Sequence, residues 1–195
     1  WSMPEEINRI LTDSITDYFF TTSKYANENL RKMGVNDKNI FFVGNTMIDT
    51  LMANIDNLRP PEFMREKQGH EYFILTLHRP TNVDSVDKLE VLINAIGEAT
   101  RGIEVIFPVH PRTLKSINLI KKTPRNFRFI DPLPYLEFNY LVRGSKAVIT
   151  DSGGITEEAT VLDIPCLTLR ESTERLETVN GGTNELVGTN PDNIR

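Results

Sequence analysis

One short segment, TDSGGITEEAT at residues 150–160, joins a run of small residues to the start of a predicted helix. Ser152, Gly153 and Gly154 would occupy the first turn of that helix, where backbone N–H groups have no partners within the helix. Because glycine has no side chain, a phosphate or diphosphate can approach these donors, and the helix dipole adds about 0.3–1 kcal/mol. The motif is weak by itself, since glycine also serves in tight turns. The chain has neither a GK[ST] loop nor a GxGxxG pattern.

Two acids, Glu157 and Glu158, follow one turn later. We interpret Glu157 as an acid that stabilises the helix start through the dipole. Glu158 has a second interpretation, because acids near phosphate-binding helices often accept hydrogen bonds from a ribose diol.

Charged or polar residues also follow the other predicted strands, beginning at His78, His110, Asp131, Asp151 and Arg170. The carboxyl ends of parallel strands share one edge of a sheet, where such folds bind ligands. Loops after strands are polar in most proteins, so a single such residue is weak evidence for a ligand site. The whole set at one edge is stronger evidence. A metal site is disfavoured, because the histidines have no cysteine partner and no HxH or HExxH spacing. Phosphate contact or proton transfer suits them better.

The elements that would position these residues alternate between strand and helix, which predicts a parallel sheet covered on both faces. The predicted fold class is therefore α/β, a Rossmann-like doubly wound sheet. The predicted strands are residues 17–22, 39–44, 71–77, 103–109, 127–130, 146–150 and 165–169. The predicted helices are residues 3–15, 23–34, 45–58, 85–100, 111–122, 135–142 and a segment that begins at Gly153.

Composition narrows the class of protein. The 195 residues suffice for one domain plus part of another. A net charge of −5 argues against nucleic acid as the main partner. Cys166 is the only cysteine, so it forms no internal disulfide, and a reducing cytoplasm is expected. No stretch approaches the roughly 20 apolar residues of a membrane span, so no membrane partner is expected. The first residues show no signal-peptide pattern and read as a helix without a lead-in, so we expect the chain to be an excerpt of a longer protein.

Eight blocks, in order and spread over nearly the whole chain, resemble the non-hydrolysing UDP-N-acetylglucosamine 2-epimerases. They are MPEEINR (3–9), FFVGNTMIDTL (41–51), TLHRPTNVD (76–84), PVHPRT (108–113), DPLPYLEF (131–138), TDSGGITEEA (150–159), PCLTLRESTER (165–175) and GTNELVG (182–188). The resemblance implies a two-domain glycosyltransferase-B-like fold with the active site between two Rossmann-like halves. Residues 1–43 would end the N-terminal half, and residues 44–195 would form the C-terminal UDP-binding domain without its last helix.

The resemblance also implies the chemistry. Family members are thought to eliminate UDP from UDP-N-acetylglucosamine, giving a 2-acetamidoglucal, and then to add UDP back with a proton on the other face of C2. That reaction needs a general acid and base and a firm hold on the diphosphate. It requires no metal and no other cofactor. The expected ligands are UDP-N-acetylglucosamine and UDP, and the full-length protein is expected to be a cytoplasmic homodimer that supplies polysaccharide synthesis.

Site residues are carried over from the matching motifs. Glu5 and His78 match the candidate catalytic residues: Glu5 as an acid/base or sugar contact, with a plain helix-start acid as the alternative, and His78 as the histidine beside the diphosphate. Phe138 matches an aromatic residue beside the uracil, although a core position is equally compatible with its spacing. The remaining residues match UDP contacts: Ser152, Gly153 and Gly154 at the diphosphate, Glu158 at the ribose and Arg175 near the phosphates.

Two positions depart from the family pattern, and three other functions stay open. Leu176 replaces the proline of TERPE, and Thr156 replaces the glutamine after SGGI.

A UDP-sugar-dependent glycosyltransferase of the same fold and a hydrolysing epimerase are the alternative enzymes. The isolated chain could also be a UDP-binding module without activity, because half of the cleft would be absent.

Overall fold

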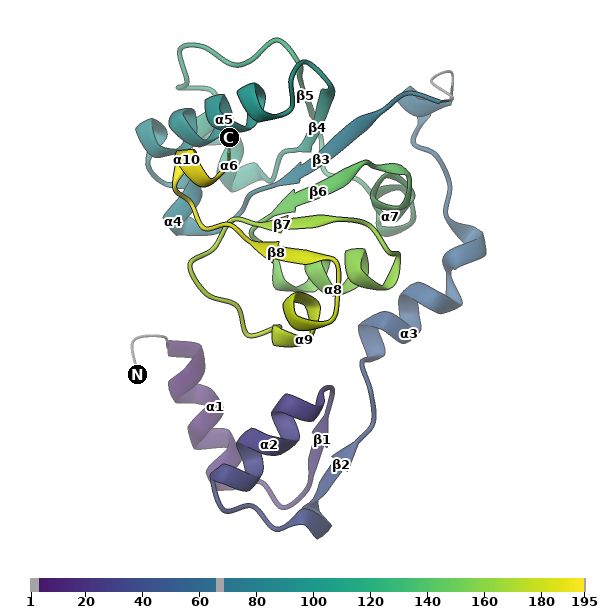
Figure 1. Cartoon of the computed structure of the whole chain (residues 1–195), viewed down its shortest axis with the longest axis vertical. Helices are drawn as coiled ribbons and strands as arrows, with labels where there is room; N and C mark the ends of the chain where they lie inside the picture. Colours follow the sequence, from purple (N-terminus) through teal and green to yellow (C-terminus); the bar gives the residue numbers. More distant parts are fainter. Residues whose placement is uncertain (1–3, 66–68, 195) are drawn as a thin grey trace. The chain divides into compact units, whose positions relative to one another are not determined.

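The computed structural model describes residues 4–65 and 69–194. The chain divides into two compact units, Trp1–Thr46 and Met47–Arg195 (Figure 1). The smaller unit contains α1 (Pro4–Ser14), β1 (Phe19–Thr21), α2 (Lys24–Lys32) and β2 (Ile40–Phe42), and α3 (Thr46–Ala53) crosses the boundary. The larger unit contains β3 (Tyr72–Thr76), α4 (Pro80–Val83), α5 (Val86–Ala99), β4 (Glu104–Pro108), α6 (Pro111–Ile117), β5 (Phe127–Ile130), α7 (Tyr135–Gly144), β6 (Ala147–Thr150), α8 (Gly153–Val161), β7 (Cys166–Thr168), α9 (Leu176–Asn180), β8 (Asn184–Leu186) and α10 (Pro191–Ile194).

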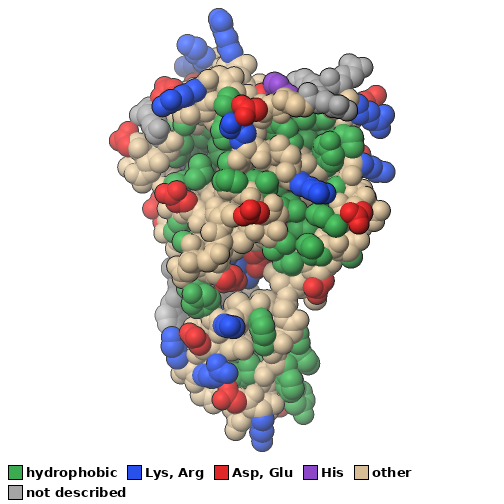
Figure 2. Space-filling view, turned by 45° about the vertical axis from the view of Figure 1, so that its right-hand side comes forward, with side chains coloured by type: hydrophobic (Ala, Val, Ile, Leu, Met, Phe, Trp, Pro, Cys, Tyr) green, Lys and Arg blue, Asp and Glu red, His purple; other side chains and the backbone are tan. Residues whose placement is uncertain are grey.

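The smaller unit follows its local sequence signals. Ser23 precedes α2 and its side chain accepts a hydrogen bond from the Ala26 amide, as expected of a helix N-cap. Gly34 follows α2 with a φ of 88°, a conformation that ends the helix and suits glycine. Strands β1 and β2 pair in parallel. Hydrophobic side chains remain at the surface of this unit (Figure 2), among them Phe20 and Phe42, which are 68% and 56% exposed.

The larger unit is built on a parallel sheet. In the described part of the chain, six strands pair in the order β5-β4-β3-β6-β7-β8, and each pair is parallel. The chain therefore starts in the middle of the sheet, extends to one side and then returns to extend to the other. This is the doubly wound Rossmann order, and the predicted fold class is confirmed. The order reverses between β3 and β6, which are neighbours, with Thr76 aligned to Thr150.

Helices cover both faces of this sheet, as the alternation of side chains along β3 requires. Leu75 belongs to a core cluster that includes residues of α5, α6 and β4. Ile74 belongs to a second cluster that includes residues of α7 and α8. Ser85 caps α5 by accepting a hydrogen bond from the Lys88 amide, so the predicted start of that helix is confirmed.

The structure departs from the predicted elements at a few places. α6 ends at Ile117, five residues before the predicted end, because the chain turns so that Ile120 packs against the first cluster. β8 was not predicted, because Asn-Glu-Leu has no apolar run. It is held by the buried Asn184, which bonds the Thr168 and Thr178 hydroxyls. Within the described ranges, no helix is both long and apolar enough to cross a membrane.

Candidate functional site

The loops after β3 and β6 meet where the strand order reverses, the position at which doubly wound sheets bind ligands. Asp151, directly after β6, is completely buried. Its carboxylate accepts hydrogen bonds from the amides of His78 and Arg79 and from Asn82 Nδ2, at 2.9–3.2 Å. Asp151 therefore fixes the β3 loop onto the β6 loop.

The side chain of His78 also bonds Asp151. Nδ1 lies 2.8 Å from Asp151 Oδ1, and the side chain is 49% exposed. Burial raises the pKa of Asp151, but the hydrogen bonds from His78 and Arg79 outweigh it and leave that pKa below its usual value. The carboxylate is thus ionised and acts only as an acceptor, so Nδ1 carries the hydrogen and Nε2 is left for a ligand. In a neutral imidazole that nitrogen accepts a hydrogen, and in an imidazolium it donates one, so a histidine here can transfer a proton to or from an oxygen of a leaving group.

The amino end of α8 differs from the starts of α2 and α5. Ser152 occupies the N-cap position, yet its side chain makes no capping hydrogen bond. The Ser152 amide is already bonded to the Thr150 hydroxyl at 3.0 Å. The first N–H groups of α8 therefore receive no acceptor from the cap and can bind an anion. The predicted residues Ser152, Gly153 and Gly154 do begin this helix.

Side chains from other segments lie close to the positions that a Cβ atom would take on Gly153 and Gly154. A Cβ atom on Gly153 would lie 2.9 Å from Glu174 Oε1, and one on Gly154 would lie 3.0 Å from the Met47 methyl carbon. Both glycines are only partly buried. The small residues therefore keep a limited space open at the helix start, and Glu174 is the acid nearest to it.

Arg175 lies beside the same helix start, 3.8 Å by its Cγ from the Cβ position of Gly153. Its Nε is 3.5 Å from Glu157 Oε1, and its side chain is 32% exposed. The interpretation of Glu157 as a helix-start acid is wrong. The first turn of α8 contains no acid, and Glu157 is instead buried one turn further on, where it pairs with Arg175.

Glu158 is buried and accepts a hydrogen bond from the Tyr135 hydroxyl at 3.0 Å. Burial raises the pKa of Glu158 more than its bonds with Tyr135 and Asn139 lower it. Phe138, one turn along α7, is partly buried against the second core cluster. Their assignments to ribose and uracil stay predictions.

The remaining residues singled out in the sequence are distributed as follows. Glu5 lies in α1, in the smaller unit, so its role at this site stays a prediction. His110 caps α6, where Nδ1 accepts a hydrogen bond from the Arg112 amide, and Arg112 pairs with Asp84. Thr156, in place of the family glutamine, bonds the Gly153 carbonyl. Over residues 4–65 and 69–194, no group of three or more His, Cys, Asp or Glu side chains is placed to hold a metal ion.

Sequence reasoning missed the roles of four residues in this site. Asp151 and Arg170 were noted only as strand-end residues, and Tyr135 and Glu174 were not singled out as partners at all. A charged residue directly after a buried strand was a usable signal for Asp151 and Arg170. No local pattern pairs Tyr135 with Glu158, because they lie on different helices.

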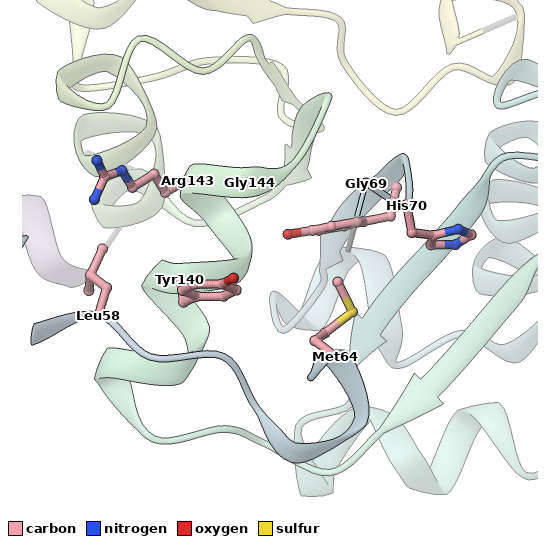
Figure 3. Close-up of a pocket in the computed structure, with 8 residues that line it drawn as sticks. Leu58, Met64, Gly69, His70, Tyr140, Arg143 and Gly144 are labelled. Atoms are coloured by element: carbon pink, nitrogen blue, oxygen red, sulfur yellow. The ribbon is translucent and has the colours of Figure 1, made fainter. Parts of the chain in front are cut away.

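A pocket in this unit lies elsewhere. A pocket of about 520 Å³ is lined by Leu58, Met64, Gly69, His70, Tyr72, Tyr140, Arg143 and Gly144 (Figure 3). Tyr72 begins β3 and Gly144 ends α7, so this pocket lies at the amino edge of the sheet. Arg143 points away from Tyr140 and Met64 (Figure 3), and its Nη1 lies 3.4 Å from the Ile55 carbonyl. Among the described lining residues, His70 pairs with Glu104 and Arg143 bonds the Ile55 carbonyl, so these two groups do not converge on the pocket.

Comparison with known proteins decides the family. The family model for UDP-N-acetylglucosamine 2-epimerase matches residues 1–195. The chain belongs to the UDP-N-acetylglucosamine 2-epimerase family. A curated 2-epimerase of that name from Methanococcus maripaludis is 42% identical over 98% of this chain. The chain spans 56% of that relative's length, so it matches only about half of a typical family member.

Solved 2-epimerases have the same fold. The crystal structure of the Methanocaldococcus jannaschii UDP-GlcNAc 2-epimerase in complex with UDP-GlcNAc and UDP is 40% identical, with a TM-score of 0.87 over 98% of this chain and 56% of that one. The Neisseria meningitidis enzyme bound to UDP-GlcNAc is 31% identical, with a TM-score of 0.85 over 98% of this chain and 54% of that one. The α/β fold predicted for this chain is therefore also that of its solved relatives.

Proposed function

We propose that this chain is the UDP-binding part of an enzyme that interconverts UDP-N-acetylglucosamine and UDP-N-acetylmannosamine at C2. The observation that carries the proposal is the convergence of His78, Asp151 and the uncapped start of α8 at the switch point of the sheet. Family membership over the whole chain supports the same conclusion. UDP and the UDP-sugar are the ligands, and the reaction needs no metal or other cofactor.

The proposed reaction has two steps, the elimination of UDP from the sugar and the return of UDP. A base removes the C2 proton, the C1–O bond to UDP breaks, and a 2-acetamidoglucal forms. UDP then adds back to C1 while a proton enters the opposite face of C2. In this chain the N–H groups at Gly153 and Gly154, together with Arg175, stabilise the charge that develops on the departing diphosphate. His78 contributes Nε2, which exchanges a hydrogen bond or proton with the same oxygens.

The other assignments complete the proposal. Glu158 binds the ribose diol, Phe138 packs beside uracil, and Glu5 serves as an acid/base or sugar contact from the smaller unit. Residues 1–43 end the N-terminal domain of a two-domain enzyme, and residues 44–195 form its C-terminal domain. We expect the full-length enzyme to be a cytoplasmic homodimer.

The test uses the full-length protein that contains this chain. Incubation with UDP-N-acetylglucosamine in D₂O should give UDP-N-acetylmannosamine with deuterium at C2, because the proton that returns comes from solvent. Accumulation of free N-acetylmannosamine and UDP would instead indicate the hydrolysing reaction, and transfer of the sugar to an acceptor would indicate a glycosyltransferase.

Binding is tested separately by calorimetry with UDP. Arg175→Gln removes a fixed charge from the phosphates, so we expect affinity to fall about tenfold. Ser152→Ala alters only a side chain that makes no cap bond, and we expect a smaller loss. Unchanged affinity in both variants would contradict the placement of the diphosphate at the start of α8.

A further inference from the structure

Arg170, which follows β7, is a buried cation with one unused nitrogen. The residue is only 9% exposed. Its Nη2 donates to Glu174 Oε2 at 2.7 Å. Its Nη1 is buried and has no hydrogen-bond partner among the residues that the structure describes. Buried guanidinium groups normally bond through several of their five N–H donors, so an unused one calls for an acceptor that arrives from outside the chain.

The unused nitrogen faces the start of α8. Arg170 Nη1 lies 3.6 Å from the position that a Cβ on Gly153 would take, and Glu174 Oε1 lies 2.9 Å from the same position. A buried guanidinium and the N–H groups of the first turn of α8 thus border one small space. Both attract negative charge, and the Glu174 carboxylate already lies beside them.

We propose that Arg170 is a further phosphate-binding residue of this site and that the Glu174 carboxylate competes with the ligand phosphate for it. The inference rests on the proposed function, because it takes the ligand to be a diphosphate. When the phosphate enters, Nη1 and Nη2 of Arg170 donate to its oxygens and Glu174 moves aside. The Glu174 side chain is 55% exposed, so it can turn to solvent.

The neighbouring charges agree with this exchange. Burial raises the pKa of Glu174, but the interactions with Arg170 and Arg175 outweigh this effect, and the net pKa lies below its ordinary value. Glu174 is therefore ionised at neutral pH and competes as an anion. The charge of Arg175 also acts on Glu174 and can attract the displaced carboxylate. It differs from Arg170 in being partly exposed and in pairing with Glu157. The two arginines therefore have separate roles, Arg170 as the inner phosphate contact and Arg175 as the outer one.

The experiment measures the dissociation constant of UDP in the full-length protein by calorimetry. Glu174→Gln removes the competing charge, and we expect affinity to rise about tenfold. Arg170→Lys keeps the charge but loses the planar pair of donors, and we expect affinity to fall about tenfold. In the double variant the gain from Glu174→Gln should disappear, because the two groups act on one another. Glu71→Gln is the matched control, since Glu71 is an exposed acid paired with Lys146 at the amino edge of the sheet.

Unchanged or weaker UDP binding in Glu174→Gln would overturn the competition. A gain equal to that of Glu71→Gln would do the same, because it would reflect net charge alone. Failure of the proposed function looks different. If the parent protein does not bind UDP, inorganic pyrophosphate is titrated instead. If pyrophosphate binds and binds more tightly in Glu174→Gln, the role of Arg170 is supported even though uridine is not recognised. If pyrophosphate does not bind, both the proposed function and the role of Arg170 are overturned.

Discussion

The two edges of the larger unit's sheet differ in what they bury. The amino edge has a pocket of about 520 Å³ whose lining includes Met64, Tyr72 and Tyr140. The carboxyl edge buries charged groups instead, Asp151, Glu158 and Arg170. Burying a charge is costly unless it is paired, so a fold retains such groups where they do chemistry or fix a loop. We therefore place the proposed site by its converging charged groups rather than by the presence of a pocket.

The largest effect should come from Asp151→Ala at the carboxyl edge. The change leaves the His78 and Arg79 amides and Asn82 without their acceptor, so we expect unfolding free energy to fall by about 3 kcal/mol. Catalysis in the full-length protein should be lost as well, because His78 loses its orientation. Denaturant unfolding and the C2 deuterium assay measure the two effects. Asp151→Asn, which keeps the shape, should lose less stability, and equal losses in both variants would count against this account.

Gly153→Ala should separate function from stability at the same edge. The new methyl group would lie 2.9 Å from Glu174 Oε1, which belongs to a flexible side chain and can shift. Alanine favours a helix over glycine by roughly 0.5–1 kcal/mol, so stability should hold or rise. UDP affinity should fall about tenfold, because the methyl group occupies the space of the phosphate. Calorimetry and thermal unfolding check this, and undiminished affinity would place the phosphate elsewhere.

The pH dependence of Glu158 offers a smaller effect. Its folded pKa is raised above the ordinary value of 4.5, so the ionised carboxylate destabilises the folded state. That penalty is absent below pH 4.5 and appears as pH rises through the raised pKa. Glu158→Gln should therefore be more stable than the parent protein at pH 7 and equal to it near pH 4. Urea unfolding over this range measures the difference, and parallel curves for the two proteins would disprove it.

The smallest effect is expected at the amino edge. Tyr72→Phe removes the hydrogen bond from the Tyr72 hydroxyl to the Leu141 carbonyl, 2.9 Å long and buried. We expect a loss of about 1 kcal/mol in unfolding free energy and no change in UDP affinity. A clear loss of UDP binding in this variant would contradict the proposal that UDP binds only at the carboxyl edge of the sheet.

Much of the fold was predictable because its signals are local. Ser23 and Ser85 mark helix starts through bonds to amides three residues away. The uninterrupted apolar run of β3 is typical of a strand buried on both faces. The short polar β8 was missed, since its support comes from Asn184 bonding other segments. The uncapped start of α8, where we propose that an anion binds, was predicted because Ser152, Gly153 and Gly154 are adjacent in sequence.

The sequence by itself thus determined the alternation of strands and helices and a helix start suited to a phosphate. Only the tertiary structure decided which residues meet there. His78 and Asp151 are 73 positions apart, and they touch because β3 pairs with β6 at the point where the strand order reverses. It likewise decided that Glu157 faces Arg175 and Glu158 faces Tyr135. Propensity and capping act over a few residues, whereas these contacts depend on the order of strands across the sheet, which no short segment encodes.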